Sequence, residues 1–282
     1  SVLGFGAMRL PMTDVNGKMV IDEDKAIPML RKAYEGGVNY FDTAYMYCDG
    51  QSEGVVGKAL KDIREKVYIS TKYPNWHRGE KTDYRKTLEE QMRRLDVNYV
   101  DFYHFHGLNG KGYDEMLIGK GLLEEAIKAK NEGLIKHISF SFHDNPEALK
   151  MLADTGNFET VLCQYNFLDR SNEDAIAYAK QKGLGVVAMG PVAGGRIAGM
   201  DPDFAKKAGI KVSSNAELAM RFVFANKNVD CALSGMSSMD MVEENLVNAD
   251  SADSPLSDKE LNSVKKLMNE YKKLSGLYCT GC

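Results

Sequence analysis

The sequence has no long run of any single kind of residue, and each absence excludes a class of protein. No apolar stretch approaches the roughly 20 residues that a helix needs to cross a bilayer. The first residues, SVLGFGAMRLP, lack the charged start and apolar run of a secretory signal. The 36 Lys and Arg and 40 Asp and Glu give a net charge of -4 without a basic cluster, so nucleic acid is not an expected partner. We therefore expect a cytoplasmic protein that acts away from membranes.

Cysteine is scarce, with 5 at uneven spacing in 282 residues. Without an export signal, such cysteines are typical of reduced thiols or metal ligands and not of a disulfide framework. We interpret Cys48, Cys163 and Cys231 as small core or loop residues. Cys279 and Cys282 in YCTGC have the two-residue spacer that lets neighbouring thiolates share a metal ion or cluster. Ordinary surface cysteines are the alternative for this pair.

Short strand-like runs alternate along the chain with longer amphipathic segments. Eight runs are rich in strand-forming residues: 2–5, 38–42, 67–72, 99–106, 135–142, 160–164, 185–189 and 230–234. In the segments between them, apolar residues recur at three- and four-residue steps, and glycine often follows the last turn. These helical segments are 22–37, 52–63, 84–96, 122–133, 146–156, 172–183, 215–227 and 238–249. Strand then helix, eight times, predicts an α/β fold, the (β/α)8 TIM barrel, with a C-terminal helical extension.

Two stretches fall outside this alternation. We expect the barrel to occupy residues 1–249, and residues 250–282 to form a C-terminal helix and the start of a cysteine-rich segment. Both ends of the sequence are expected to be truncated relative to a longer polypeptide. Within the barrel, the glycine-rich and charged stretch 194–213 is a candidate lid.

Titratable side chains gather at the ends of three consecutive predicted strands. Asp42 ends the second strand, Lys72 the third and His106 the fourth, while Tyr47 lies in the loop after Asp42. The carboxyl ends of the strands form the active face of a (β/α)8 barrel. We therefore predict that the four side chains converge in one pocket. A single acid there is often a helix cap and a single lysine a surface charge, but the conjunction favours a catalytic site.

These residue types suit the protonation of an oxygen atom. A phenol titrates near 10 in water, and we expect the Lys72 ammonium to lower the pKa of Tyr47 toward neutral pH. Asp42 is expected to keep that lysine charged, and His106 to hold a carbonyl oxygen by a hydrogen bond. Because no side chain carries hydride, a cofactor must supply it. A Schiff-base role for Lys72 is less favoured, because an acid-paired ammonium is a poor nucleophile.

Seven segments together carry a resemblance to a known family: GFGAMRLP, FDTAYMYCDGQSE, ISTKY, DFYHFHGL, QYNFLDR, GPVAGG and LSGMSSMDMVEENL. In this order they resemble the successive signatures of the aldo-keto reductase superfamily over residues 2–249. The resemblance implies a nicotinamide dinucleotide bound without a Rossmann domain and a small-molecule carbonyl substrate. It also implies a catalytic tetrad of Tyr47, Lys72, Asp42 and His106. Tyr45 competes for the phenol role, but the family's spacing from the aspartate selects Tyr47.

The resemblance also implies where the dinucleotide, NADP or NAD, binds. The residues concerned are Ser141, Gln164, Met189, Gly190, Pro191, Val192, Gly194, Gly235, Met236, Ser237, Ser238, Glu244 and Asn245. Ser141 is the retained half of a Ser-Asn pair, and Leu162 competes with Gln164 for a glutamine position. Gly235 and Met241 stand where NADP-preferring members carry Lys and Arg. This makes NADH, or weak dinucleotide binding, more credible than a preference for NADPH.

The C-terminal cysteines resemble the start of a further signature. A subgroup of aldo-keto reductase-like proteins continues from the barrel into Cys-x-x-Cys-x-x-Cys and a later Cys-Pro. This implies that Cys279 and Cys282 are two ligands of a 4Fe-4S cluster, with an electron-transfer partner for the protein. A dinucleotide-binding regulatory or redox-sensing subunit with little turnover is the alternative function, although the complete tetrad disfavours it.

Overall fold

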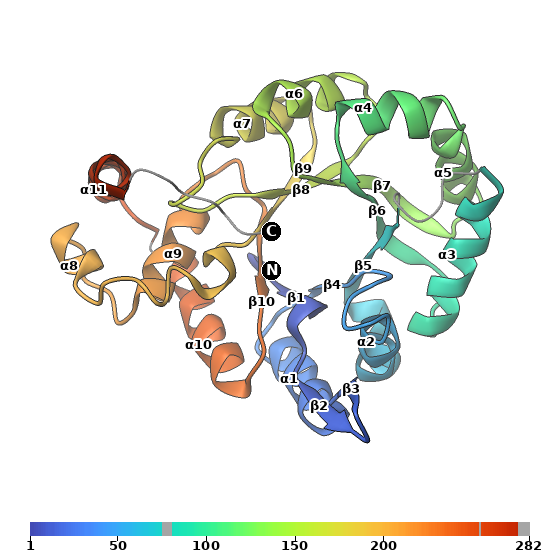
Figure 1. Cartoon of the computed structure of the whole chain (residues 1–282), viewed down its shortest axis with the longest axis horizontal. Helices are drawn as coiled ribbons and strands as arrows, with labels where there is room; N and C mark the ends of the chain where they lie inside the picture. Colours follow the sequence, from blue (N-terminus) through green and yellow to red (C-terminus); the bar gives the residue numbers. More distant parts are fainter. Residues whose placement is uncertain (75–80, 254, 276–282) are drawn as a thin grey trace.

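Eight parallel strands close into a barrel in the computed structural model, which describes residues 1–74, 81–253 and 255–275 (Figure 1). Around the barrel the order is β1-β10-β9-β8-β7-β6-β5-β4. The strands are β1 (Leu3–Gly6), β4 (Tyr40–Asp42), β5 (Tyr68–Tyr73), β6 (Val100–Leu108), β7 (Ile135–Phe142), β8 (Thr160–Gln164), β9 (Gly185–Met189) and β10 (Cys231–Gly235). All eight coincide with predicted strands, so the prediction of a (β/α)8 barrel is confirmed.

Helices follow the barrel strands and form an outer ring (Figure 1). They are α1 (Glu23–Glu35), α2 (Ser52–Leu60), α3 (Lys81–Leu95), α5 (Leu122–Asn131), α6 (Pro146–Asp154), α7 (Glu173–Gln181), α9 (Asn215–Phe224) and α10 (Met239–Asp250). Each turns an apolar stripe toward the strands; in α1, for example, Ala26, Met29, Leu30 and Ala33 are buried. This burial, more than intrinsic helix propensity, stabilises such short helices. The main hydrophobic core therefore lies between the strands and the helical ring.

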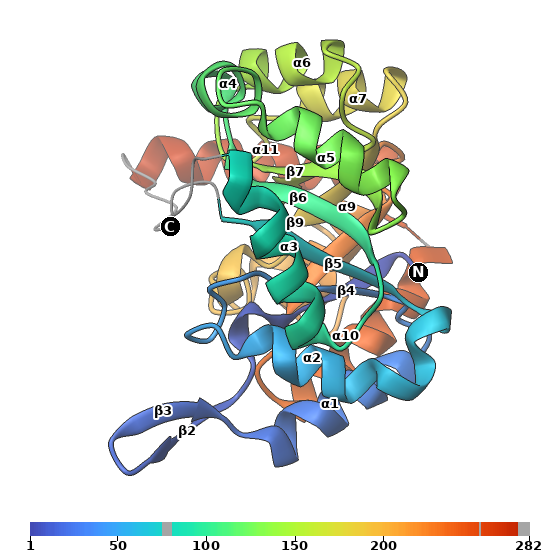
Figure 2. The ribbon, with the colours of Figure 1, turned by 90° about the vertical axis from the view of Figure 1, so that its right-hand side faces the viewer.

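An unpredicted hairpin joins the first strand to the first helix. Strands β2 (Met12–Val15) and β3 (Lys18–Ile21) pair antiparallel through Asn16 and Gly17. Figure 2 shows the hairpin projecting from the body of the molecule beside α1. Asn16 and Gly17 have φ angles of 55 and 81, the left-handed conformation that a tight two-residue turn requires. The Asn-Gly pair between extended residues was the available sequence signal.

Other short elements lie in the longer loops. The loop after β6 contains α4 (Gly110–Gly112) and the π-helical turn η3 (Tyr113–Ile118), neither of which was predicted. The predicted lid region contains α8 (Phe204–Lys207) and begins within the turn η4 (Ala193–Gly195). Ile197 and Phe204 of this region are fully buried. The region is therefore anchored in the core, and a closing movement stays a prediction.

The expected C-terminal helix is present as α11 (Asp258–Ser275), at the periphery of the barrel in Figure 1. Its Val264 and Met268 are buried in the main core. Lys265 Nζ donates a hydrogen bond of 2.7 Å to Glu173 Oε1 at the start of α7. The helix is thus docked on the barrel, while the division at residue 249 stays a prediction. Cys279 and Cys282 lie outside the described residues.

Buried side chains inside the barrel include a small apolar cluster and a set of polar residues. A separate buried cluster of strand residues contains Tyr40, Leu162, Val187, Cys231 and Leu233. Toward the carboxyl ends, the buried polar side chains are Asp42, Ser70, Lys72 and His104. Cys48, Cys163 and Cys231 are free thiols, as expected. The buried charged pair of Asp42 and Lys72 marks the carboxyl end of the barrel as the place where chemistry is possible.

Candidate active site at the carboxyl end of the barrel

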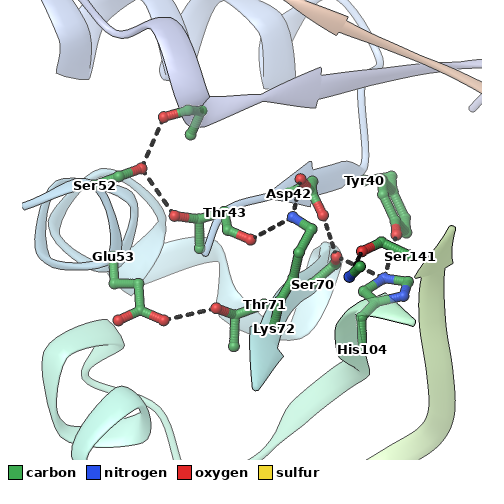
Figure 3. Close-up of polar contacts among 12 residues, drawn as sticks. Tyr40, Asp42, Thr43, Ser52, Glu53, Ser70, Thr71, Lys72, His104 and Ser141 are labelled. Carbon is green, nitrogen blue, oxygen red and sulfur yellow. Dashed lines mark hydrogen bonds and ion pairs between the residues drawn. The ribbon is translucent and has the colours of Figure 1, made fainter. Parts of the chain in front are cut away.

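The centre of the candidate site is an ion pair between neighbouring strands β5 and β4. Lys72 Nζ donates to Asp42 Oδ2 at 2.6 Å and to the Thr43 carbonyl oxygen at 2.7 Å (Figure 3). Burial lowers the pKa of Lys72, but Asp42 and Tyr47 outweigh it, and the pKa is raised above its ordinary value. The lysine therefore stays an ammonium, which argues against a Schiff-base nucleophile.

Tyr47 lies over this ammonium, as the tetrad prediction requires. Lys72 Nζ is 4.7 Å from the centroid of the Tyr47 ring. Burial raises the pKa of Tyr47, and although the Lys72 charge opposes the rise, the pKa remains above its ordinary value. The expectation that Lys72 brings this pKa down toward neutral pH is thus wrong for this structure, because desolvation of the phenolate is the larger effect.

His106 completes the convergence from strand β6. Its ring meets the Tyr47 ring edge-on, with 6.1 Å between centroids. Burial, with the nearby Lys72 charge, lowers the pKa of His106 to about 2, so the ring is neutral and offers one N–H donor. The strand register shifts between Phe105 and Leu108, and such irregularities redirect a side chain. The structure therefore brings all four predicted catalytic residues to one place.

Two further interior residues, Ser70 and His104, support the aspartate. Ser70 Oγ donates to Asp42 Oδ1 at 2.5 Å, and His104 Nε2 is 3.1 Å from Ser70 Oγ. Because the Ser70 proton points to the carboxylate, the Ser70 oxygen faces the His104 ring as an acceptor. Burial lowers the pKa of His104 to about 3, so it is a neutral interior residue. Ser70 was missed, although it shares the inward parity of Lys72 two residues later.

The residues predicted to hold the nicotinamide end of the dinucleotide lie at the ends of β7, β8 and β9. Ser141 is buried, and its Oγ accepts from the backbone N–H of Gly107 at 2.8 Å, directly after His106. Gln164 and Met189 are register partners at the strand ends. Gly190 has φ +63, and a Cβ there would lie 2.9 Å from Gln164 Oε1. Glycine at 190 is therefore required for Gln164 to keep its place.

The next two predicted positions, Gly194 and Gly235, lie beside Arg9. A Cβ at Gly194 would be 3.0 Å from Arg9 Nη2, and one at Gly235 would be 3.6 Å from Arg9 Cδ. Both glycines are exposed, so Arg9 lies between two bare backbone segments at the barrel mouth. Pro191 is buried, Val192 is half-buried and the Met236 side chain is fully buried. Only the backbone of Met236 is thus available to a ligand.

The remaining predicted positions lie at the start of α10 and in its second turn. Ser238 caps the helix, and its Oγ accepts from the Met241 N–H at 3.4 Å, whereas Ser237 is exposed. Glu244 Oε1 accepts from Ser214 Oγ at 2.8 Å. Asn245 is buried, and its Nδ2 donates to Ser234 Oγ at 3.1 Å. The side chain of Asn245 is thus already engaged within the protein.

Comparison with known proteins decides the family. The profile described as "Aldo/keto reductase family" matches residues 2–269. The chain belongs to this family. L-galactose dehydrogenase of Arabidopsis thaliana is 29% identical over 301 residues, which cover 98% of this chain and 92% of the relative. As a member of the family, this aldo-keto reductase is an oxidoreductase.

Solved structures agree with this assignment. An aldo-keto reductase from Bacillus halodurans in its holo form is 28% identical and superposes with a TM-score of 0.79, covering 94% of this chain and 91% of that one. A Klebsiella pneumoniae aldo/keto reductase in complex with NADP and acetate is 26% identical, with a TM-score of 0.78 and coverage of 95% and 91%. The barrel of this aldo-keto reductase is thus shared with enzymes of the family.

Two features are absent from the described part of the aldo-keto reductase. No three His, Cys, Asp or Glu side chains there come together in a metal-binding group. None of the helices described is both long and apolar enough to span a membrane.

Proposed function

We propose that this aldo-keto reductase interconverts a carbonyl compound and its alcohol, with Tyr47 as proton donor and acceptor. The observation that carries the proposal is the convergence of Lys72 on Asp42 and Tyr47, 2.6 Å from the carboxylate oxygen and 4.7 Å from the phenol ring centroid. In reduction, the Tyr47 hydroxyl gives its proton to the carbonyl oxygen, and the Lys72 ammonium stabilises the resulting phenolate. The neutral His106 donates a hydrogen bond that orients the same oxygen. A bound nicotinamide supplies the hydride.

The residues at the barrel mouth fit a dinucleotide with its two phosphates. Gly190, Gly194 and Gly235 leave backbone accessible at the ends of β9 and β10, where side chains would fill the space. The Arg9 guanidinium lies beside Gly194 and is exposed, so it offers a positive charge for a phosphate. The NADP bound to the Klebsiella relative supports the same class of cofactor here.

The test compares two tyrosines of one loop. With 4-nitrobenzaldehyde as probe carbonyl and NADH or NADPH as reductant, we expect Tyr47→Phe to lose about 1,000-fold or more in kcat. Binding of either dinucleotide, followed by fluorescence, should be unchanged. Tyr45→Phe removes the competing phenol and should retain most of the turnover. Activity that survives in Tyr47→Phe but is lost in Tyr45→Phe would assign the proton donor to Tyr45 instead.

The choice of substrate extends this proposal. Because one relative is described as L-galactose dehydrogenase, L-galactose with NAD or NADP is the probe for the oxidative direction. Binding of both dinucleotides without turnover of any probe in either direction would support the regulatory subunit over the enzyme.

We also infer a two-cysteine contribution to an iron–sulfur centre. The support is the Cys-x-x-Cys spacing of Cys279 and Cys282. Protein purified without oxygen should contain iron and sulfide, and Cys279→Ser should lower both. Protein without iron that retains full carbonyl reduction would contradict the cluster and leave the reductase proposal intact.

A further inference from the structure

A fully buried carboxylate, Glu53, lies behind the catalytic residues and has no part in the chemistry described above. It lies in the first turn of α2 and is 0% exposed. Its Oε1 accepts from Thr71 Oγ1 and from Gln91 Nε2, both at 2.6 Å. Burial raises the pKa of Glu53 despite these hydrogen bonds. Removing a carboxylate from water costs free energy, so the burial of Glu53 next to the site needs a physical reason.

The partners of Glu53 lead directly to the catalytic lysine. Thr71 precedes Lys72 on β5, and Figure 3 shows the Thr71 hydroxyl turned toward Glu53. Gln91 Nε2 also lies 3.1 Å from the Lys72 carbonyl oxygen, and Gln91 Oε1 accepts from Tyr103 OH at 2.6 Å. The backbone that carries Lys72 is therefore held from outside the barrel by α2 and α3.

Arg94 on α3 connects the same carboxylate to the loop that carries Tyr47. Its Nη1 is 3.4 Å from Glu53 Oε2 and 3.3 Å from the Tyr45 carbonyl oxygen. The guanidinium lies over the Tyr45 ring, 4.3 Å from its centroid, and pairs with Glu90, which accepts from Tyr45 OH at 3.3 Å. Arg94 thus contacts both the ring and the backbone of Tyr45, two positions before Tyr47.

Ser52, the residue before Glu53, holds the start of the loop that carries Tyr47. Ser52 Oγ donates to the Ala7 carbonyl oxygen at 2.8 Å and lies 2.8 Å from Thr43 Oγ1. The Thr43 carbonyl oxygen is the second acceptor for Lys72 Nζ, at 2.7 Å. One turn of α2 therefore fixes the start of the catalytic loop, while Arg94 fixes its middle.

We propose that Glu53 and Arg94 are positioning residues that set the placement of Tyr47 over Lys72. The inference rests on the proposed function of Tyr47 and Lys72. Neither residue contacts the reacting atoms; Glu53 acts through Thr71 and Gln91 on the lysine backbone, and Arg94 acts through Tyr45 on the loop. Proton transfer is sensitive to displacements of about 1 Å, so a loosened loop slows chemistry while the dinucleotide contacts at β9 and β10 stay intact.

The first measurement is kinetic. Arg94→Ala should lower kcat for 4-nitrobenzaldehyde reduction by about tenfold, with the Kd for NADPH and NADH changed by less than about twofold. Arg94→Lys keeps the charge without the planar stack and should restore part of the loss. Arg93→Ala is the matched control, because Arg93 is the exposed neighbour on the same helix and should have wild-type kinetics.

The second measurement does not depend on turnover. Protein labelled with 3-fluorotyrosine gives a fluorine resonance for Tyr47, identified by its absence in Tyr47→Phe. In Arg94→Ala this resonance should move toward the position of exposed tyrosines or broaden, and in Arg93→Ala it should not. Tyr45→Leu removes the stacked ring but leaves the Glu53 ion pair, so it repeats the test should Arg94→Ala fail to fold.

The outcomes separate this inference from the proposed function. An unchanged Tyr47 resonance in folded Arg94→Ala and Tyr45→Leu would overturn the positioning role, and so would wild-type kcat in either. A wild-type protein that turns over no probe would count against the proposed function, while the fluorine measurement would still decide whether Arg94 places Tyr47.

Discussion

Lys72 and Asp42 form an ion pair from which water is almost wholly excluded. The two side chains are 1% and 2% exposed, and 2.6 Å separates Nζ from Oδ2. An exposed pair with the same distance, Lys61 and Asp96, has side chains that are 71% and 62% exposed. The protein therefore contains two ion pairs of equal length in opposite environments. Their comparison shows how burial changes the effect of removing one partner.

Asp42→Asn is expected to lower the free energy of unfolding by about 3 kcal/mol, because the Lys72 charge is then buried without its counterion. Asp96→Asn, which breaks the exposed pair, should change it by less than about 1 kcal/mol. Urea denaturation of both variants measures the difference. Equal effects would show that Lys72 loses its proton or reaches water when Asp42 is removed.

Acid should destabilise the protein through its buried histidines. Burial lowers the pKa of His104 from 6.5 to about 3, so below pH 6.5 the unfolded chain takes up a proton that the folded chain does not. The stabilising contribution is fully present above pH 6.5 and is lost as pH falls toward 3, by about 1.4 kcal/mol per pH unit. His104→Gln should reduce the slope of unfolding free energy against pH between 6 and 4. An unaltered slope would mean that His104 is not the group that titrates.

The contact between α2 and α3 should not tolerate a side chain at Gly57. A Cβ at Gly57 would lie 2.3 Å from the Leu95 carbonyl oxygen, whereas one at Gly54 would lie 4.0 Å from the nearest atom, the Arg94 carbonyl oxygen. Gly57→Ala is therefore expected to lower the free energy of unfolding by about 2 kcal/mol. Gly54→Ala should raise it by up to about 1 kcal/mol, because alanine is the better helix former. Thermal and urea unfolding of the pair test this, and a stable Gly57→Ala would contradict the close approach of the helices.

The preference between the two dinucleotides should respond to charge at the start of α10. Met241 is 45% exposed in the first turn of this helix, at one of the positions where NADP-preferring relatives are expected to carry a cation. Met241→Arg should improve the ratio of kcat/KM for NADPH over NADH by about tenfold, through an added contact to the 2′-phosphate. Val247→Arg, at a 70% exposed position later in the helix, is the control for added charge alone. Equal NADPH-to-NADH ratios of kcat/KM in the two variants would show that the 2′-phosphate does not bind next to Met241.

The barrel, and the meeting of Asp42, Lys72 and His106 at its carboxyl end, could be predicted from local sequence patterns. The eight strands were predictable because period-two and helical apolar patterns are local, and the carboxyl ends of parallel strands share one face. Asp42, Lys72 and His106 follow from that rule. Even the unpredicted hairpin at Asn16 and Gly17 has a local signal in the sequence.

The tertiary structure decided the environment of these residues. Whether burial or the Lys72 charge governs the pKa of Tyr47 depends on how closely residues from different strands pack, and no local pattern contains that distance. The environment of Glu53 also depends on residues distant in the sequence. Glu53 lies on the apolar face of α2 with Val56 and Leu60. The sequence places a charge on that face, but only the fold supplies Thr71, Gln91 and Arg94 as its partners. Their contacts span 18 to 41 positions along the chain, and therefore exist only once the barrel has closed.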